Sequence, residues 1–141
     1  MNLRAICSAV AMFSIAVLAS PAFGQNTSDK IDSDLKKCLA QHTNFTTAGM
    51  VNCVGTAYQQ MDSRLNEVYS LLMGKLTPPK RELLKDAQRK WLAFRDAELK
   101  LTKSLDPNVG GTISSVTGAG DSYEILKKRT KEIEQHLRTI N

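Results

Sequence analysis

Residues that most catalytic and metal sites depend on are scarce in this chain. Its 141 residues include two histidines and three cysteines, with no Cys-x-x-Cys pair. A nucleophile needs a neighbouring base and a third group that orients it, and a zinc site needs three or four converging ligands. His42 lies in an expected turn and His136 on an expected amphipathic helix, so we interpret both as surface residues. The sequence predicts no metal site and no enzyme.

Motifs that bind phosphate or nucleic acid are missing as well. Gly110 and Gly111 lack the glycine spacing and the downstream lysine of a P-loop, so we expect no nucleotide and no other cofactor. Lys and Arg number 19 against 14 Asp and Glu, but the basic residues are spread along the chain. This distribution indicates a solvated surface, not a nucleic-acid interface.

A long hydrophobic run occurs only at the start of the chain. Arg4 is followed by an uncharged run over residues 5–18, and the small residues Ala22 and Gly24 come shortly after it. This order is typical of a secretory signal peptide, which we predict at residues 1–24. Its apolar run is too short to span a membrane.

Removal of that segment defines the mature domain. We expect cleavage before Gln25, with cleavage after Ala22 as the alternative, and residues 25–141 then form one small domain. Cys7 precedes the apolar run, whereas lipid attachment needs a cysteine at its far end. The formal charge falls from +5 to +4, since Arg4 is removed. We therefore expect a periplasmic or secreted protein with no membrane insertion after processing.

Two cysteines survive this processing. Cys38 and Cys53 form an even pair in an exported protein, which most simply makes one disulfide bond. Closing a loop of about 15 residues stabilises a fold by roughly 3 kcal/mol in the chain-entropy model. Such a gain matters for a domain this small.

Helical periodicity runs through most of the mature domain, and no convincing strand occurs. The predicted fold class is all-α, a small antiparallel bundle of about four helices. The first helix covers residues 31–41 and ends in a turn at His42-Thr43-Asn44. The second starts at a cap formed by Thr46 or Thr47 and continues to Leu76.

Prolines separate the second helix from the third. Thr77-Pro78-Pro79 stops the second helix, and Pro79 begins a third that runs to about Ser104. Two long helices joined by such a tight turn are expected to pack as an antiparallel hairpin. This hairpin would set Leu65, Val68 and Leu72 against Leu84, Ala87, Trp91 and Phe94.

The periodicity disappears between Leu105 and Gly120. We predict a long Gly/Ser-rich loop here, and such loops are either functional or loosely ordered. An acidic capping box of Asp121 and Glu124 would then begin the last helix. That helix would close the bundle.

Motifs on the second and third expected helices combine into a family pattern. The pieces are Met50-Val51-Asn52-Cys53, Leu65-Asn66-x-x-Tyr69, Gln88-x-x-Trp91-x-x-x-Arg95-Asp96, Gly110-Gly111-Thr112 and Arg129. Together they resemble the LprI-like lysozyme-inhibitor family of small exported helical domains, over roughly Cys38 to Leu137. The family usually has a second cysteine pair where this chain carries Leu99 and Tyr123. That departure leaves the predicted loop less restrained.

The resemblance implies a noncatalytic periplasmic protein that binds and inhibits lysozyme or a related peptidoglycan-cleaving enzyme. A lysozyme-like protein is therefore the expected partner. The alternative is a cell-envelope adaptor or structural protein that binds another exported protein through its helical hairpin. The sequence specifies no oligomeric state.

Candidate site residues fall into two groups. A fork of donors beside an adaptable loop suits protein recognition, and the partner-binding candidates are Arg95, Asp96, Gly110, Gly111 and Thr112. Polar and aromatic side chains at facing positions suit a structural network, and the scaffold candidates are Asn66, Tyr69, Gln88, Trp91 and Arg129. In the structural interpretation, Arg95 and Asp96 instead fix the loop or neighbouring backbone.

Overall fold

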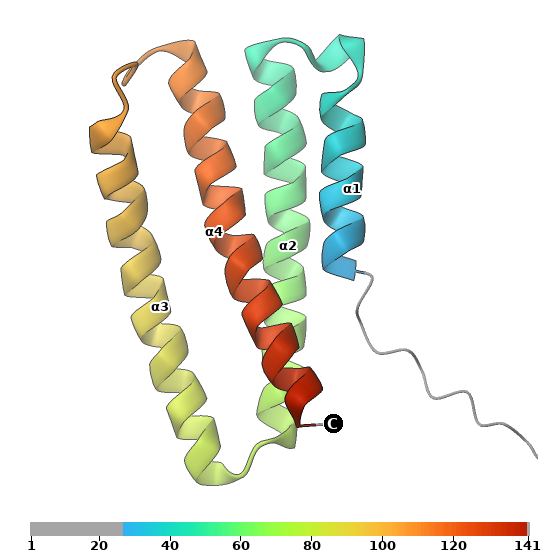
Figure 1. Cartoon of the computed structure of the whole chain (residues 1–141), viewed down its shortest axis with the longest axis vertical. Helices are drawn as coiled ribbons and strands as arrows, with labels where there is room; N and C mark the ends of the chain where they lie inside the picture. The colour runs from blue at the N-terminus through green and yellow to red at the C-terminus, as the bar shows by residue number, and fades with distance from the viewer. Residues whose placement is uncertain (1–26, 141) are drawn as a thin grey trace, which may run out of the picture.

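The computed structural model describes residues 27–140, and this part of the chain consists of helices with short connections (Figure 1). The predicted signal peptide at residues 1–24 lies outside the described residues. The elements are α1 (Thr27–Leu39), a 3-10 turn (His42–Asn44), α2 (Thr47–Lys75), α3 (Pro78–Leu105) and α4 (Thr112–Thr139). No strand occurs within residues 27–140, and the prediction of an all-α fold with about four helices is confirmed.

Local chemistry explains where α2 ends and α3 begins. The side chain of Thr46 accepts a hydrogen bond from the Gly49 amide at 3.0 Å, which confirms one of the two predicted caps. α2 stops at the residues before the proline pair. Pro78 occupies the first turn of α3, where its missing amide donor costs nothing, so α3 begins one residue earlier than predicted.

Consecutive helices alternate in direction, but their order in space differs from their order in sequence. Figure 1 shows them side by side as α3, α4, α2 and α1. The core lies mainly between α2 and α4, which run in the same direction, and α1 covers the other side of α2. The buried apolar residues are Ile31, Val54, Ala57, Met61, Leu65, Val68, Leu72, Leu84, Tyr123, Leu126, Ile133 and Leu137.

α3 packs less closely than the predicted hairpin requires. Leu84 is the only buried residue of α3, and Trp91 is partly buried against the core. Ala87 is exposed, and the Phe94 side chain is 55% exposed, so their predicted packing against α2 is wrong. The reason is α4, whose 28 residues run along the 29 residues of α2 and occupy that face.

The connection before the last helix is much shorter than the predicted 105–120 loop. α4 begins at Thr112, so residues 112–120 are helical, and Asp121 and Glu124 lie inside the helix instead of capping it. Gly, Ser, Thr and Val have low helix propensity, and for this reason a loop was predicted here. Tertiary packing compensates, because Ala119 contacts the core and Tyr123 is buried in it.

A disulfide ties α1 to α2, as predicted. Cys38 near the end of α1 is bonded to Cys53 in the second turn of α2, with their Cα atoms 5.8 Å apart. The Asn44 side chain donates to the Cys38 carbonyl at 2.9 Å, so the intervening turn is also held. A disulfide and a hydrogen bond therefore both fix the connection between α1 and α2.

Gly49 leaves no room for a side chain, which gives a test of this connection. A Cβ atom there would lie 2.7 Å from the Asn44 Cα. We expect Gly49→Ala to lower the free energy of unfolding by about 1–3 kcal/mol, since the opposing atom is backbone. Urea denaturation measures this. Gly55→Ala in the same helix is the matched control, because its Cβ would meet nothing within 4 Å, and it should stabilise by up to about 1 kcal/mol. Equal effects of the two variants would contradict the close approach.

Candidate functional site

The partner-binding candidates from the sequence lie at two places. Arg95 and Asp96 are in the middle of α3, whereas Gly110, Gly111 and Thr112 lie where α3 connects to α4. Arg95 precedes the end of α3 by ten residues, which corresponds to about 15 Å along the helix. The structure therefore does not bring the five candidates together, and Arg95 does not fix the connection.

The α3–α4 connection, residues 106–111, is a tight and well-bonded turn that we call the tip. The Asn108 amide donates to the Asp106 carboxylate at 2.8 Å, and the Gly111 amide donates to the Asn108 carbonyl at 2.8 Å. Gly110 has a φ of 87°, a conformation that disfavours other residues. These bonds give the tip one defined shape.

Asp106 also joins the tip to the first turn of α4. Its carboxylate accepts hydrogen bonds from the Ser114 side chain and the Asn108 amide, and these lower its pKa below the ordinary value. A carboxylate near a helix start also interacts favourably with the helix dipole. Gly111, the residue that precedes α4, offers no side-chain cap, and Asp106 contacts the first turn of α4 through the Ser114 side chain instead.

Apolar side chains surround the tip and lie in solvent. Leu105 is 72% exposed, Val109 59% and Ile113 52%. They come from the last residue of α3, the tip itself and the start of α4. Clustered exposed aliphatic residues on a rigid support are suited to contact another protein.

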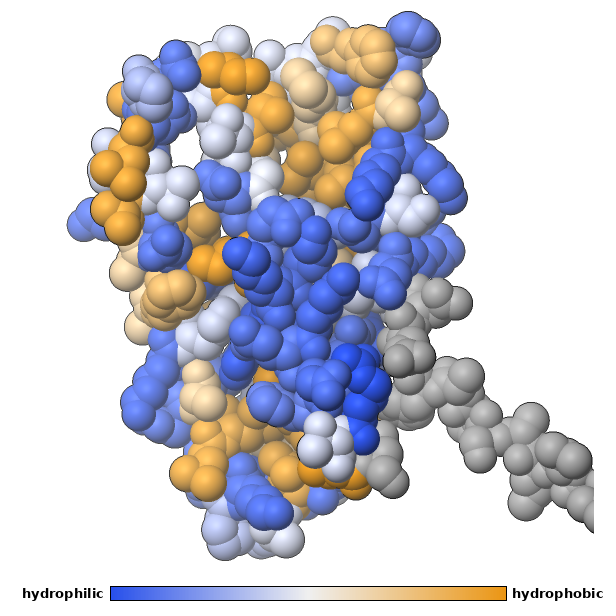
Figure 2. All heavy atoms as spheres, in the orientation of Figure 1, coloured by the Kyte–Doolittle hydropathy of each residue, from blue (hydrophilic) through white to orange (hydrophobic). Residues whose placement is uncertain are grey.

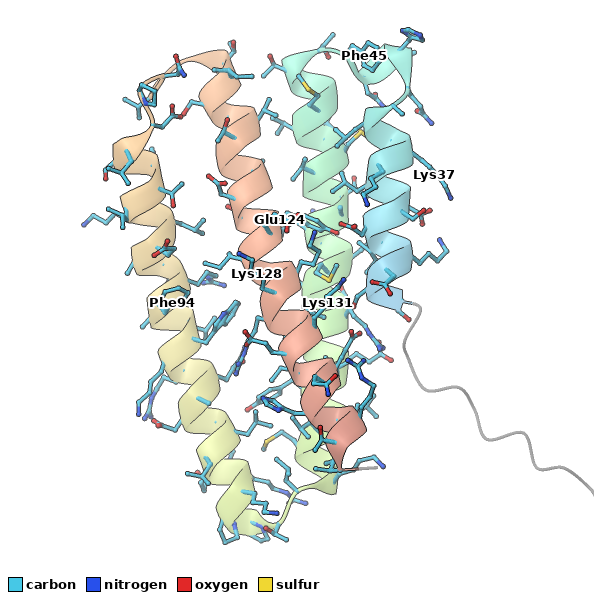
Figure 3. The ribbon with its side chains drawn as sticks, viewed as in Figure 1. Lys37, Phe45, Phe94, Glu124, Lys128 and Lys131 are labelled. Atoms are coloured by element: carbon cyan, nitrogen blue, oxygen red, sulfur yellow. A yellow bond between two sulfur atoms is a disulfide. The ribbon has the colours of Figure 1, made fainter. Side chains whose placement is uncertain are left out.

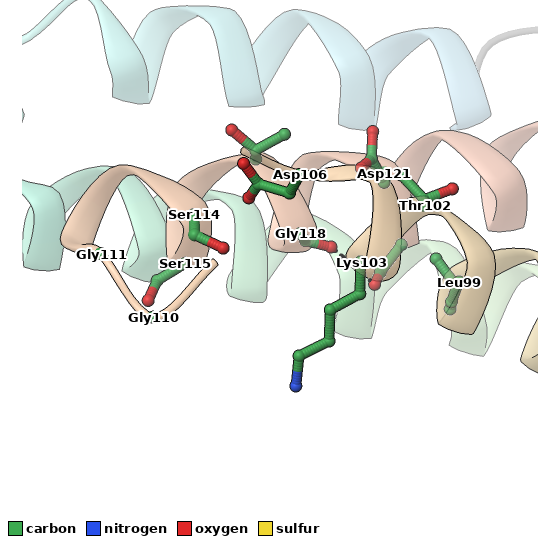
Figure 4. A pocket seen from close by; sticks show the side chains of 12 residues that line it. Leu99, Thr102, Lys103, Asp106, Gly110, Gly111, Ser114, Ser115, Gly118 and Asp121 are labelled. Atoms are coloured by element: carbon green, nitrogen blue, oxygen red, sulfur yellow. Dashed lines mark hydrogen bonds between the residues drawn. The ribbon is translucent and has the colours of Figure 1, made fainter. Parts of the chain in front are cut away.

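A hollow of about 410 Å³ lies between α3 and α4 beside the tip (Figure 4). Small residues of α4 leave this space, notably Ser114, Ser115 and Gly118, and the tip glycines border it. Asp106, Asp121 and Lys103 supply its charged groups. The hollow therefore offers hydroxyl, carboxylate and backbone groups beside the apolar tip.

Trp91 lies within a cationic cluster that links α3 to α4. The Arg129 Nε donates to the Gln88 Oε1 at 3.0 Å. The guanidinium carbon atoms of Arg95 and Arg129 lie 5.6 Å and 5.8 Å from the Trp91 ring centroid. Arg95 also donates to the carboxylate of Asp96 at 2.7 and 2.8 Å. The structure thus brings together three of the predicted scaffold residues, namely Gln88, Trp91 and Arg129.

The other two scaffold candidates lie elsewhere. Asn66 is exposed and donates to Asp62 on its own helix at 3.2 Å, so it does not reach the Trp91 cluster. Tyr69 is partly buried and packs against the core. The expected polar contact across α2 and α3 does not form because α4 occupies the face of α2.

A buried ion pair escaped the sequence analysis. Arg64 on α2 and Glu134 on α4 are buried, and the Arg64 Nε donates to the Glu134 Oε1 at 2.8 Å. The Ser28 hydroxyl of α1 donates to the same oxygen at 2.8 Å. This group joins three helices. Arg64 lies three residues after Met61 on the apolar side of α2. This position in the sequence could have indicated that Arg64 is buried.

A second polar group joins α1 to α4. The Tyr123 hydroxyl and the Lys127 Nζ lie 3.3 Å and 3.1 Å from the Asp32 Oδ1. Burial alone would raise the pKa of Asp32, but hydrogen bonds from Lys127 and Lys36 outweigh burial and lower it. Burial and the negative charge of Asp32 raise the pKa of Tyr123. Asp32 therefore stays ionised and holds α1 in place.

Two further features bear on the class of function. Across α1 to α4, each helix is too short or too polar to cross a membrane. Within residues 27–140, no group of three or more His, Cys, Asp or Glu side chains could hold a metal ion. His42 and His136 are both exposed, as the sequence predicted.

Comparison with known proteins gives one family, one similar sequence and one similar structure. The family model described as "Lysozyme inhibitor LprI" matches residues 38–133. An uncharacterized protein of Rhizobium meliloti (strain 1021) is 27% identical over an alignment of 96 residues, and the match covers 59% of this chain and 68% of that protein. A crystal structure of an uncharacterized protein from Burkholderia thailandensis matches with a TM-score of 0.68 and 24% identity. The match covers 78% of this chain but 54% of that one, and it shows a shared fold.

Proposed function

This chain belongs to the lysozyme inhibitor LprI family, and we propose that it is an exported, noncatalytic protein that binds and inhibits lysozyme or a related peptidoglycan-cleaving enzyme. The family match over residues 38–133 is the observation that carries the proposal. It includes the tip, the Trp91 cluster and the Cys38–Cys53 disulfide. A disulfide of this kind persists in an oxidising compartment, which supports a periplasmic or secreted location.

The tip is the part of the structure best suited to enter an enzyme cleft. It is narrow, its backbone is fixed by hydrogen bonds, and Val109 stands exposed at its centre. A rigid insert loses little conformational entropy on binding, so more of its contact energy appears as affinity. Of the five sequence candidates, Gly110, Gly111 and Thr112 fit this role, and Arg95 and Asp96 do not, since they lie along α3.

Charge near the tip also suits a basic target. The whole chain is basic, so its long-range field does not attract a basic lysozyme. Asp106 and Asp121 at the hollow outnumber Lys103 there, which makes the local charge negative. The negative charge at the tip therefore favours a basic target at short range, although the net charge of the chain does not attract it from a distance.

A cell-wall lysis assay tests the proposed inhibition. Residues 25–141, purified with the disulfide intact, are added to several lysozymes acting on peptidoglycan, and turbidity loss is followed. We expect at least one enzyme to be inhibited at micromolar protein. If none is inhibited while circular dichroism shows a folded helical protein, the adaptor alternative becomes the better account. Release of wall fragments by the protein alone would instead indicate that the protein is an enzyme.

Substitutions at the tip locate the inhibitory surface. We expect Val109→Asp and Ile113→Asp each to weaken inhibition by about tenfold or more, since burying a charge at an apolar contact is unfavourable. The inhibition constant in the lysis assay measures this effect. Leu83→Asp is the matched control, because Leu83 is similarly exposed but lies at the opposite end of α3. Full potency of both tip variants would reject the tip as the insert.

A further inference from the structure

Two long stretches of the chain contain no Asp, Glu, Lys or Arg. They are residues 38–61 and residues 107–120, although charged residues make up 23% of the whole sequence. The first stretch includes the 3-10 turn and the first half of α2, and the second includes most of the tip and the start of α4. Figure 1 shows the 3-10 turn and the tip at the same end of the bundle. The fold therefore gathers the two uncharged stretches at one end.

Apolar side chains cross this end from the 3-10 turn to the tip. Phe45 directly follows the 3-10 turn and is 59% exposed (Figure 3). Val51 of α2 and Val116 of α4 are half-buried and lie outside the buried core. Val51 precedes Val54 by three positions and Val116 precedes Tyr123 by seven, so both continue the core-facing sides of their helices. We call this surface the bundle end, and its apolar residues are Phe45, Met50, Val51, Val109, Ile113 and Val116.

The 3-10 turn holds Phe45 in a fixed position. The Asn44 amide donates to the Gln41 carbonyl at 2.9 Å, and the Phe45 amide donates to the His42 carbonyl at 3.3 Å. The ring centroids of His42 and Phe45 lie 4.8 Å apart. The disulfide and the Asn44 side chain also tie the turn to α1. An exposed aromatic ring on a fixed backbone loses little conformational entropy when it binds a partner.

The tip alone is too small for a specific protein complex. It consists of residues 106–111, whereas a standard interface uses about 20–30 residues and about 800 Å² on each side. Residues 41–51 and 106–116, which are the two connections and the helix turns after them, together supply about 20 residues. Neighbouring helices lie about 8–10 Å apart, so an end that spans α3, α4, α2 and α1 is about 25–30 Å long. The bundle end therefore has the size of a standard interface.

We propose that the whole bundle end contacts the inhibited enzyme, with the tip in the cleft and Phe45 on the enzyme surface beside the cleft. This inference rests on the proposed function and adds a second contact to it. Interface centres are depleted of charged residues and enriched in aromatic ones, and the bundle end has this composition. Both connections also lie within the family match over residues 38–133.

The composition of the bundle end indicates which enzyme surface fits it. A charged group of the enzyme buried against this end would find no opposite charge, so the fitting surface beside the cleft is uncharged and partly apolar. Asp106 and Asp121 border the hollow between α3 and α4 and mark the edge of the uncharged area. Figure 2 shows apolar and weakly polar residues at this end, above a broad hydrophilic area. A basic group of the enzyme is therefore expected at the hollow and not beside Phe45.

Removal of the Phe45 ring tests the second contact. We expect Phe45→Ala to weaken inhibition at least about tenfold in the lysis assay, because a large side chain at the interface is lost. Phe94→Ala is the matched control, since the same side chain is 55% exposed on α3, away from the bundle end, and it should keep full potency. Urea unfolding should give both variants nearly the stability of the unchanged chain, because both rings are more than half exposed. Equal potency of the two variants would overturn the proposal.

Photo-cross-linking locates the contact while an aromatic ring is kept. With p-benzoylphenylalanine in place of Phe45, ultraviolet light should join the chain covalently to the inhibited enzyme. The same replacement of Phe94 should give no such product. A product from the Phe94 position alone, or from neither position, would contradict the second contact. A product that joins the Phe45 position to peptidoglycan and not to the enzyme would also contradict it.

The tip variants separate this inference from the proposed function. If the unchanged chain inhibits no enzyme, the proposed function fails, and the bundle end loses its partner with it. If the unchanged chain inhibits and Val109→Asp weakens inhibition while Phe45→Ala does not, the tip acts alone. In that case the proposed function stands and the second contact is wrong.

Discussion

Arg64→Met is expected to lower the free energy of unfolding by about 3–5 kcal/mol. Arg64 and Glu134 are both less than a tenth exposed, and they join α2 to α4 through a hydrogen bond of 2.8 Å. Removal of the guanidinium leaves the Glu134 carboxylate buried, and within residues 27–140 the Ser28 hydroxyl is its remaining donor. Desolvation of that carboxylate is then no longer balanced by an opposite charge. Total stabilities of small domains are about 5–15 kcal/mol, so the variant should be only marginally folded.

The double variant separates lost charge pairing from lost packing. Arg64→Met combined with Glu134→Leu removes both charges and keeps apolar volume, so we expect it to be more stable than Arg64→Met alone by about 2 kcal/mol or more. Lys85→Met provides the control, because Lys85 and its partner Glu82 are both exposed and such pairs contribute about 0–1 kcal/mol. Urea unfolding followed by circular dichroism measures all three. A double variant less stable than Arg64→Met would show that packing, not pairing, dominates at this site.

This ion pair also shows where sequence reasoning stops. Charged residues are seldom buried, so the residue types of Arg64 and Glu134 do not indicate a buried pair. Their separation of 70 residues gives no local pattern that joins them. By contrast, Thr46, the proline pair and the two cysteines act on their immediate neighbours. For that reason the disulfide was predicted correctly, and the helix ends that these residues set were predicted to within one residue.

The place of α3 in the bundle could not be predicted from periodicity. Its residues follow a helical pattern that fits packing on either α2 or α4, and only the length of α4 decides between them. That length was underestimated because Gly118, Gly120 and their neighbours have low helix propensity. Because of this error, Phe94 was expected to pack in the core, whereas its side chain is 55% exposed. For the same reason a long loop was predicted where the structure has a short connection at residues 106–111.

The candidate site was predicted in part. Gln88 and Arg129 were expected to accompany Trp91, and their side chains do meet beside that ring, because residues on one helix face meet side chains of a neighbouring helix. The exposure of Val109 and Ile113 was not foreseen. Side-chain exposure depends on how α3, the tip and α4 are arranged in space, which no short motif encodes.

Reduction of the Cys38–Cys53 bond is expected to lower the free energy of unfolding by about 3 kcal/mol, the value for a loop of this length. The bond restricts the conformations that the unfolded chain can adopt. In the folded state it holds the end of α1 against α2. The oxidised and the reduced forms of the same chain are compared in urea, so no side chain changes. A thiol count confirms full reduction. A difference below about 1 kcal/mol would mean that the contacts of Ile31 and Asp32 hold α1 without the bond.

The two perturbations should interact, because α1 also covers the buried ion pair. Ser28 lies in the first turn of α1 and donates to Glu134. Once the disulfide is reduced, α1 is free to shift and admit water to the Glu134 carboxylate, which relieves the penalty that Arg64→Met creates. We therefore expect the combined loss of unfolding free energy to be smaller than the sum of the separate losses, by about 1 kcal/mol or more. Strict additivity would mean that α1 keeps its position on Glu134 after reduction, and that the disulfide acts through the unfolded chain alone.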